Sequence, residues 1–107
     1  MASEQVIAMV TAPAGDADSL ARRIVEAKLA ACVHVLQAGR STYWWKGKIE
    51  EADEQTLIIK TLRTAISGLT TLLDETHPYD VYELLVLDVS DGNADYLSWM
   101  TDSVAAS

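Results

Sequence analysis

The order in which hydrophobic spacing changes along this chain constrains its fold more strongly than any single motif. Alternation typical of strands and the i, i+3, i+4 spacing typical of helices follow one another along the sequence. The predicted elements are a strand at 4–12, a helix from about 17 to 31, strands at 32–45 and 48–61, a helix at 63–76, a strand at 82–89 and a short helix after Asn93. Two strand–helix–strand units therefore enclose a hairpin.

Residues that break or turn the backbone separate these elements. Pro13 closes the first strand, and Pro78 disfavours helical backbone at His77, so the second helix must end there. The Lys-Gly pair at 46–47 forms the hairpin turn, because glycine readily adopts positive φ. This order predicts an α+β protein with one domain over residues 1–107. The expected fold is a ferredoxin-like βαββαβ sandwich with an extra C-terminal helix and a long hairpin between its second and third strands.

The predicted hairpin is too long for a compact monomer of this size. Strands of about 14 residues, at about 3.3 Å per residue, span roughly 45 Å. A compact chain of about 100 residues has a radius of gyration of about 13 Å, so the tip should project beyond the body. The tip carries Tyr43, Trp44 and Trp45. Either a second subunit covers these rings, or the strands end elsewhere and one tryptophan packs on its own core; the projection favours a second subunit.

The fourth strand gives a second reason to expect self-association. In the ferredoxin-like order this strand lies at a sheet edge, yet residues 84–87 read Leu-Leu-Val-Leu. Edge strands of soluble proteins usually carry charge or proline, which prevents pairing with another chain. We therefore predict a homo-oligomer whose interface includes Tyr43, Trp44, Trp45, Leu84 and Val86.

The acidic charge of the chain restricts its partners and its location. The chain contains eight Lys and Arg residues and 16 Asp and Glu residues, which gives a net charge of −8 at pH 7. Such a surface repels nucleic-acid phosphates, and the apolar runs are far too short to cross a bilayer. No secretory signal is evident, and one cysteine forms no internal disulfide. We expect a cytoplasmic protein with neither a nucleic-acid nor a membrane partner.

The sequence contains no established catalytic or metal-binding motif. Cys-x-x-Cys, His-x-His, His-Glu-x-x-His and Gly-x-Ser-x-Gly spacings are all missing, so the prediction is no catalytic residue and no enzyme. Cys32 and His77 are the candidate soft-metal ligands. Cys32 is alternatively a small buried residue, and His77 a hydrogen-bonding group that fixes its loop. For His34 we expect a position facing solvent or a neighbouring subunit, and the acidic run at 50–54 is more typical of a solvated ribbon than of a calcium loop.

Five segments of the chain resemble one known family in both order and spacing. They are "KLAACVHVL" at 28–36, "STYWWKGKIEE" at 41–51, "LIIKT" at 57–61, "HPYDVYELLVL" at 77–87 and "DYLSWM" at 95–100. This pattern resembles the CutA family of divalent-cation tolerance proteins. The resemblance implies a ferredoxin-like subunit in a tight homotrimer, built by long hairpins and edge strands and similar in architecture to the PII signalling trimers. It also implies a role in tolerance of copper and other divalent cations.

The resemblance also bears on single positions. Some members of the family are described as binding copper through a cysteine late in the first strand and two adjacent histidines before Pro-Tyr. The matching positions here are Val10, Thr76 and His77, so only His77 keeps the ligand type. Tyr82 and Asp88 stand where the family commonly has proline, which restores two backbone N–H donors near the fourth strand.

These observations combine into one functional hypothesis and two alternatives. The hypothesis is a cytoplasmic homotrimer that takes part in divalent-cation tolerance, with no obligatory cofactor. In this hypothesis copper or another divalent metal binds weakly at clefts between subunits, through Cys32 and His77. One alternative is a PII-like signalling or small-molecule-binding trimer. The other is a structural scaffold with no direct role in metal binding.

Overall fold

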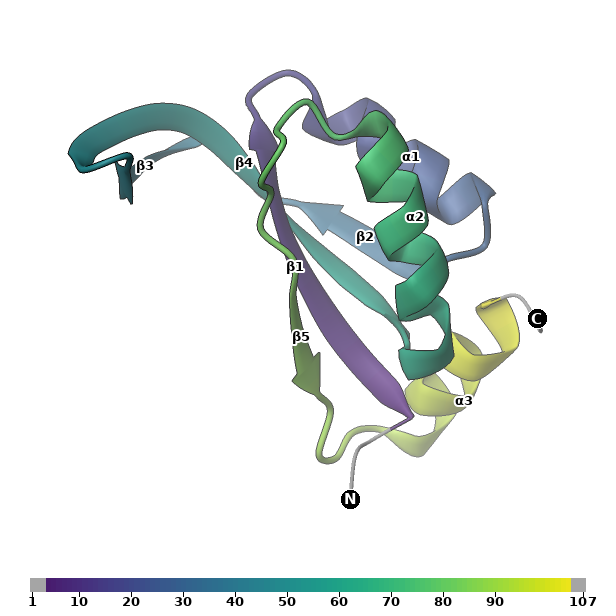
Figure 1. The fold of residues 1–107 in the computed structure, drawn as a ribbon. Coiled ribbons are helices and arrows are strands. Elements are labelled where there is room, and N and C mark those ends of the chain that lie inside the picture. The colour runs from purple at the N-terminus through teal and green to yellow at the C-terminus, as the bar shows by residue number, and fades with distance from the viewer. Residues whose placement is uncertain (1–3, 105–107) are drawn as a thin grey trace.

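The computed structural model describes residues 4–104 and contains five strands and three α-helices (Figure 1). In chain order the elements are β1 (Gln5–Pro13), α1 (Ala17–Glu26), β2 (Cys32–Val35), β3 (Gly39–Trp45), β4 (Lys48–Leu62), a 3-10 turn (Arg63–Ala65), α2 (Ile66–Thr76), β5 (Leu85–Asp88) and α3 (Ala94–Ser103). This confirms the predicted order. None of the helices within residues 4–104 is long and apolar enough to cross a membrane.

Three predicted boundaries were wrong, each for a local reason. The second strand is divided into β2 and β3, because the chain leaves the ladder between Val35 and Gly39. Helix α1 ends at Glu26 because Lys28 adopts a φ of 58°, and this left-handed residue turns the chain away from the helix axis. Strand β5 starts at Leu85 rather than at 82, since the preceding residues pack towards α2 and the core instead of pairing with β1.

The sheet has the order β2-β4-β1-β5, with β3 pairing with the outer half of β4, and every pair is antiparallel. This is the ferredoxin-like arrangement, and it places β5 at an edge as predicted. Strand β4 is 15 residues long and pairs with three different strands. It therefore connects the body of the sheet to the projecting hairpin.

One face of the sheet carries the hydrophobic core. Along β1 the residues alternate between buried and half-buried, and the buried set packs with α1 and α2 on the same face (Figure 1). The core consists of Ala8, Val10, Ala12, Ala17, Leu20, Ala21, Ile24, Ala30, Leu57, Ile59, Leu69 and Leu73. The opposite face is different, because Ile7, Met9 and Ile58 there remain half-buried.

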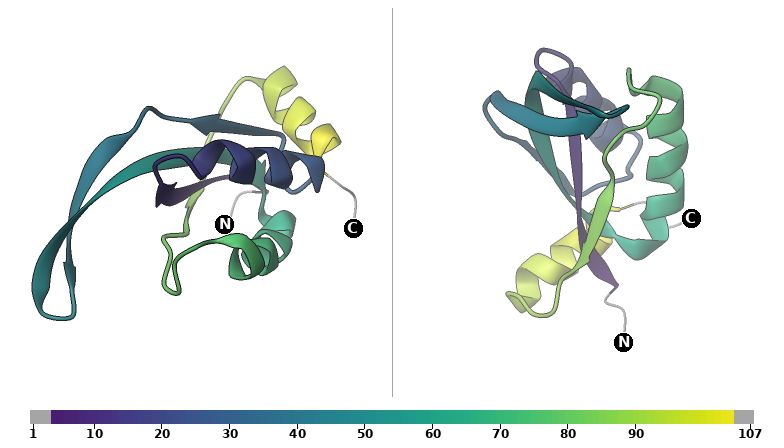
Figure 2. Two further views of the ribbon diagram at one scale, coloured as in Figure 1. Left: turned by 90° about the horizontal axis from the view of Figure 1, so that it is seen from above. Right: turned by 60° about the vertical axis from the view of Figure 1, so that its left-hand side comes forward.

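Helix α3 lies against one end of the sheet, beside β1 and β4 (Figures 1 and 2). Asn93 forms its N-cap, since the Asn93 side-chain oxygen accepts a hydrogen bond from the Tyr96 N–H at 3.0 Å. The helix buries Met100, and Gln5 Nε2 donates to Thr101 Oγ1 at 3.2 Å. Tyr96 and Trp99 point outward from this helix, with ring centroids 5.2 Å apart.

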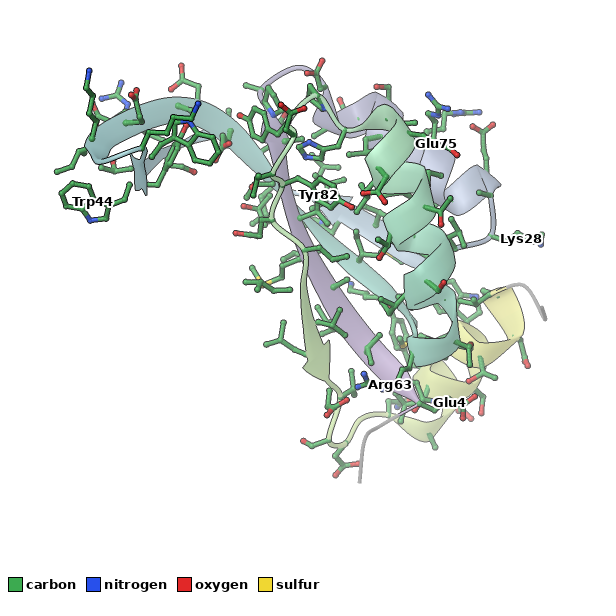
Figure 3. All side chains as sticks on the ribbon, viewed as in Figure 1. Glu4, Lys28, Trp44, Arg63, Glu75 and Tyr82 are labelled. Atoms are coloured by element: carbon green, nitrogen blue, oxygen red, sulfur yellow. The ribbon has the colours of Figure 1, made fainter. Side chains whose placement is uncertain are left out.

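The β3–β4 hairpin projects from the body as an isolated, curved two-stranded ribbon (Figure 2). The described chain measures 44 × 26 × 23 Å, so the projection that its length predicts is confirmed. Trp44 is 72% exposed at the tip (Figure 3), and Tyr43 and Trp45 are also exposed. The alternative in which one of these tryptophans packs on its own core is therefore wrong.

The turn of the hairpin explains why the chain reverses where it does. Lys46 and Gly47 have φ values of 51° and 78°. Two consecutive positive φ values match the right-handed twist of a two-residue hairpin, and glycine at the second position adopts such a value without steric cost. The register that results places Trp44 opposite Ile49 and Trp45 opposite Lys48.

Candidate functional site

The segment between α2 and β5 is anchored by His77. This residue ends α2 with extended backbone, as predicted from Pro78, and its side chain is buried. The Nε2 atom lies 2.7 Å from the Thr11 carbonyl oxygen, and Nδ1 accepts a hydrogen bond from the Tyr79 N–H at 3.1 Å. A neutral imidazole with its proton on Nε2 satisfies both contacts. His77 thus ties this segment to β1.

Two tyrosines surround the imidazole and extend the anchor. The Tyr82 ring stacks on His77 with centroids 5.0 Å apart, and the Tyr79 ring is tilted against it at 5.1 Å. The Tyr82 hydroxyl donates to Asp74 Oδ1 at 2.6 Å, and this hydrogen bond, with burial, raises the pKa of Tyr82 to about 12. Figure 3 shows Tyr82 beside α2. Tyr82 therefore has a packing role in this segment.

Asp88 lies at the end of β5. Its carboxylate forms an ion pair with the guanidinium of Arg63. Arg63, which Figure 3 labels, is the first residue of the turn that leads into α2. The backbone N–H of Arg63 donates a hydrogen bond to the Glu4 carbonyl oxygen at 2.8 Å. Asp88 thereby ties the edge strand to the segment that follows β4.

A cavity of about 620 Å³ lies between the base of the hairpin and the segment after His77. This volume is within the range of small-molecule sites, about 300–1,000 Å³. Its lining consists of Thr11, Ser41, Thr42, Tyr43, Trp45, Glu54, Pro78, Tyr79, Asp80, Val81 and Glu83. We call this cavity the hairpin-base pocket. It combines aromatic rings, hydroxyl groups and carboxylates from four separate parts of the chain: β1, β3, β4 and the segment after His77.

Two carboxylates in the hairpin-base pocket influence one another. Burial raises the pKa of Glu83, and the negative charge of Glu54 raises it further. Glu54 Oε2 accepts a hydrogen bond from the Tyr79 hydroxyl at 2.7 Å, and burial together with this bond raises the pKa of Tyr79 to about 12. The pocket therefore holds negative charge that lacks full hydration.

Replacing Glu83 with glutamine is expected to stabilise the protein at neutral pH. A raised pKa means that the folded state binds the Glu83 proton more tightly than the unfolded state does. The resulting stability is present below the ordinary pKa of 4.5 and is lost as pH rises through the raised value. Urea unfolding at pH 4 and pH 7 checks this. The gain in free energy of unfolding should be larger at pH 7, and a gain that is equal at both pH values would contradict it.

The structure does not bring the two predicted metal ligands together within one chain. Cys32 is half-buried at the start of β2, opposite Lys60, whereas His77 contacts Thr11, which is opposite Thr56. Four residues along β4 correspond to about 13 Å. Within residues 4–104 no group of three or more His, Cys, Asp or Glu side chains could hold a metal ion. A shared Cys32–His77 site would need ligands from two subunits.

The predicted interface residues occupy different surroundings. Trp44 faces away from the hairpin-base pocket, whereas Tyr43 and Trp45 line it. Leu84 packs against the core, and Val86 lies opposite Ala8 on the face covered by the helices. The neighbours in β5, Leu85 and Leu87, are 56% and 49% exposed, and Ile49 of the hairpin is 62% exposed.

Sequence reasoning did not select Ile49, Leu85, Leu87 or the pocket carboxylates Glu54 and Glu83. Strand alternation could have identified the first three. It places Leu85 and Leu87 on the opposite face of β5 from Val86, and it places Ile49 on the same face of the hairpin as its cross-strand neighbour Trp44. No comparable signal marks the pocket. Its walls are far apart in the sequence and meet only because His77 sets the path of its segment.

The fold and its long hairpin define a class: an α+β protein with a ferredoxin-like antiparallel sheet and a C-terminal helix against one end. Comparison with known proteins identifies the family within that class. The family described as "CutA1 divalent ion tolerance protein" matches residues 6–103. The chain belongs to this family, which confirms the resemblance seen in its motifs.

Individual relatives agree with this assignment. A divalent-cation tolerance protein CutA of Pectobacterium atrosepticum is 43% identical over 94% of this chain and 93% of its own length. The crystal structure of CutA1 from Oryza sativa has a TM-score of 0.94 and 36% identity, covering 99% of this chain and 98% of that one. A CutA1 structure from Shewanella sp. SIB1 also reaches a TM-score of 0.94, with 34% identity, and covers 99% of this chain and 100% of that one.

Proposed function

We propose that this CutA-family protein acts in the cytoplasm as a homotrimer that contributes to tolerance of divalent cations, copper among them. The observation that carries the proposal is the family match over residues 6–103, supported by relatives named for divalent-cation tolerance. The role is one of binding rather than of catalysis, and no cofactor is obligatory.

Exposed apolar surface supports the assembly in this proposal. Trp44 and Ile49 face each other across the hairpin and are 72% and 62% exposed, and the edge strand β5 exposes Leu85 and Leu87. Large apolar side chains exposed in neighbouring positions on a hairpin or an edge strand are typical of interfaces between proteins. The number of three subunits comes from the family resemblance. Tyr43, Trp45, Leu84 and Val86 remain predicted interface residues as well.

Weak metal binding at clefts between subunits is the proposed mechanism. Cys32 supplies a thiol on a half-buried strand, and a soft ion such as copper prefers thiolate and imidazole ligands. His77 binds a metal only after one of its two hydrogen bonds is broken, so its affinity for an ion should be low. The binding required for tolerance would then arise from ligands on neighbouring subunits.

A PII-like trimer that binds a small molecule is the second candidate function. The hairpin-base pocket favours it, because the cavity has the volume of a small-molecule site. In that case the metal phenotype of relatives would be an indirect consequence of signalling. A purely structural scaffold is the remaining alternative.

Calorimetric titration of Cu(II), and of Cu(I) under reducing conditions, tests the mechanism. We expect saturable binding at an integral ratio per subunit that is weakened in Cys32→Ser. His34→Ala serves as a matched control, since His34 is an exposed histidine on the same strand. The mechanism is wrong if neither copper ion shows saturable binding to the wild type, or if Cys32→Ser binds as the wild type does.

A further inference from the structure

The hairpin-base pocket has a chemical character that metal tolerance does not explain. Its lining includes three carboxylates, Glu54, Asp80 and Glu83, and contains no lysine, arginine or histidine. The salt bridges formed within residues 4–104 join Arg22 to Glu26, Arg40 to Asp53 and Arg63 to Asp88, so none involves a pocket carboxylate. Negative charge in a concave, partly dehydrated site attracts a cation more strongly than the same charge on an open surface.

Aromatic rings form the other walls of the pocket. Tyr43 and Trp45 come from β3, and Tyr79 comes from the segment anchored by His77. The face of an aromatic ring attracts cations, and tryptophan does so best. The chain already uses this property, because the Lys46 ammonium lies 5.8 Å from the Trp45 ring centroid. The pocket therefore offers a cation two kinds of contact, with the faces of aromatic rings and with carboxylate oxygens.

The layout of the pocket favours an organic cation over a metal ion. A compact metal ion needs several ligands that meet at one point, and residues 4–104 contain no such group. An ammonium group on an apolar body has different needs. Its N–H groups require acceptors, which the carboxylates and the Thr11 and Ser41 hydroxyls supply. Its apolar part requires surface such as Trp45 and Val81.

We propose that the hairpin-base pocket binds a small primary amine in its ammonium form, with the ammonium held by Glu54 and Glu83 and the apolar body packed on Trp45. Glu54 keeps one carboxylate oxygen for the ligand, since the Tyr79 hydroxyl occupies Oε2. Burial and, after it, repulsion from Glu54 raise the pKa of Glu83, and a cation between the two carboxylates relieves that repulsion. This site is separate from Cys32, which lies in β2 opposite Lys60 of β4.

Titration with 2-phenylethylamine tests the proposal, because this probe carries an ammonium group on a short aromatic body. The full chain, in whatever assembly it forms, is titrated at pH 7 by calorimetry and by NMR. We expect saturable binding and shifted signals from Trp45 and Tyr79. The uncharged analogue 2-phenylethanol should bind about tenfold more weakly or worse, the effect of losing hydrogen bonds to charged groups.

Charge-neutral variants locate the site. Glu54→Gln/Glu83→Gln should weaken amine binding about tenfold or more, since both carboxylates lose their charge. Glu4→Gln/Glu26→Gln changes the net charge equally at exposed positions outside the pocket and should bind as the wild type does. Trp45→Leu, which keeps both carboxylates, should also weaken binding; because Trp45 is a predicted interface residue as well, its mass in solution is compared with that of the wild type. The proposal is overturned if no saturable binding occurs, if the alcohol binds as well as the amine, or if the control variant is weakened as much as the pocket variant.

Discussion

Replacing Trp44 and Ile49 together with alanine is expected to convert the assembled protein into monomers. These two side chains lie opposite each other on the outer face of the hairpin, and they are its two most exposed large apolar residues. Truncating a buried tryptophan at an interface commonly costs about 2 kcal/mol or more, which corresponds to about thirtyfold in affinity. Each chain in a closed ring uses its hairpin once per interface, so the whole assembly should be lost at micromolar concentration.

Light scattering coupled to size-exclusion chromatography measures this outcome. The wild type should have about three times the chain mass of 11.7 kDa, and the double variant a single chain mass. Trp99→Ala is the control, because it also removes an exposed indole, from α3 rather than from the hairpin. A wild-type mass of one chain, or an unchanged mass in the double variant, would refute the role of the hairpin. Because Trp44 and Ile49 do not line the hairpin-base pocket, amine binding by the double variant also reports whether the pocket needs the assembly.

Replacing His77 with alanine should lower the free energy of unfolding by about 2 kcal/mol or more, whether or not a metal binds. Two hydrogen bonds contribute about 0.5–1.5 kcal/mol each, and the ring contacts with Tyr79 and Tyr82 add a similar amount. The variant also leaves the Thr11 carbonyl and the Tyr79 N–H without their partner. Denaturation by urea, with circular dichroism as the signal, measures the change.

His34→Ala is the control for this measurement, since His34 is exposed and surface substitutions usually change stability by less than about 0.5 kcal/mol. Equal stability of His77→Ala and wild type would show that the anchor is dispensable. The prediction has a practical consequence for copper titrations. Weaker binding in His77→Ala reports a lost ligand only if the variant is still folded and its pocket segment still follows the same path.

The element order and the edge position of the fourth strand could be predicted because they depend on local patterns. Prolines such as Pro13 and Pro78 end strands or helices through their own backbone geometry. Asn93 caps α3 through a hydrogen bond with Tyr96, only three residues further along the chain. The early end of α1 could not be predicted in the same way. It depends on Lys28, a residue with no intrinsic preference for positive φ, which the surrounding tertiary structure holds in that conformation.

The contents of the candidate site were harder to predict than the fold. Tyr43, Trp44 and Trp45 are adjacent in sequence, and strand geometry alone implies that Trp44 faces away from the other two. Which face meets the pocket depends on how the ribbon curves, and composition carries no signal for that curvature. The pairing of Tyr79 with Glu54 spans 25 residues and follows from the path of the His77 segment. Contacts of this kind arise only when distant segments meet.

Strand β4 pairs with different strands along its length, so its two parts differ in how well they should tolerate substitutions. From Glu54 onward it bonds to β1 or β2 and contributes to the core, and the Asp53 carbonyl oxygen accepts from the Ala14 N–H at 3.1 Å, whereas residues 48–52 pair with β3. Substitutions in the outer part leave the body of the subunit intact, while the same substitutions further along would disrupt it. A hairpin tip taken from a relative could therefore be grafted between Gly39 and Asp53. Such exchanges would alter which chains recognise one another while each subunit still folds in the same way.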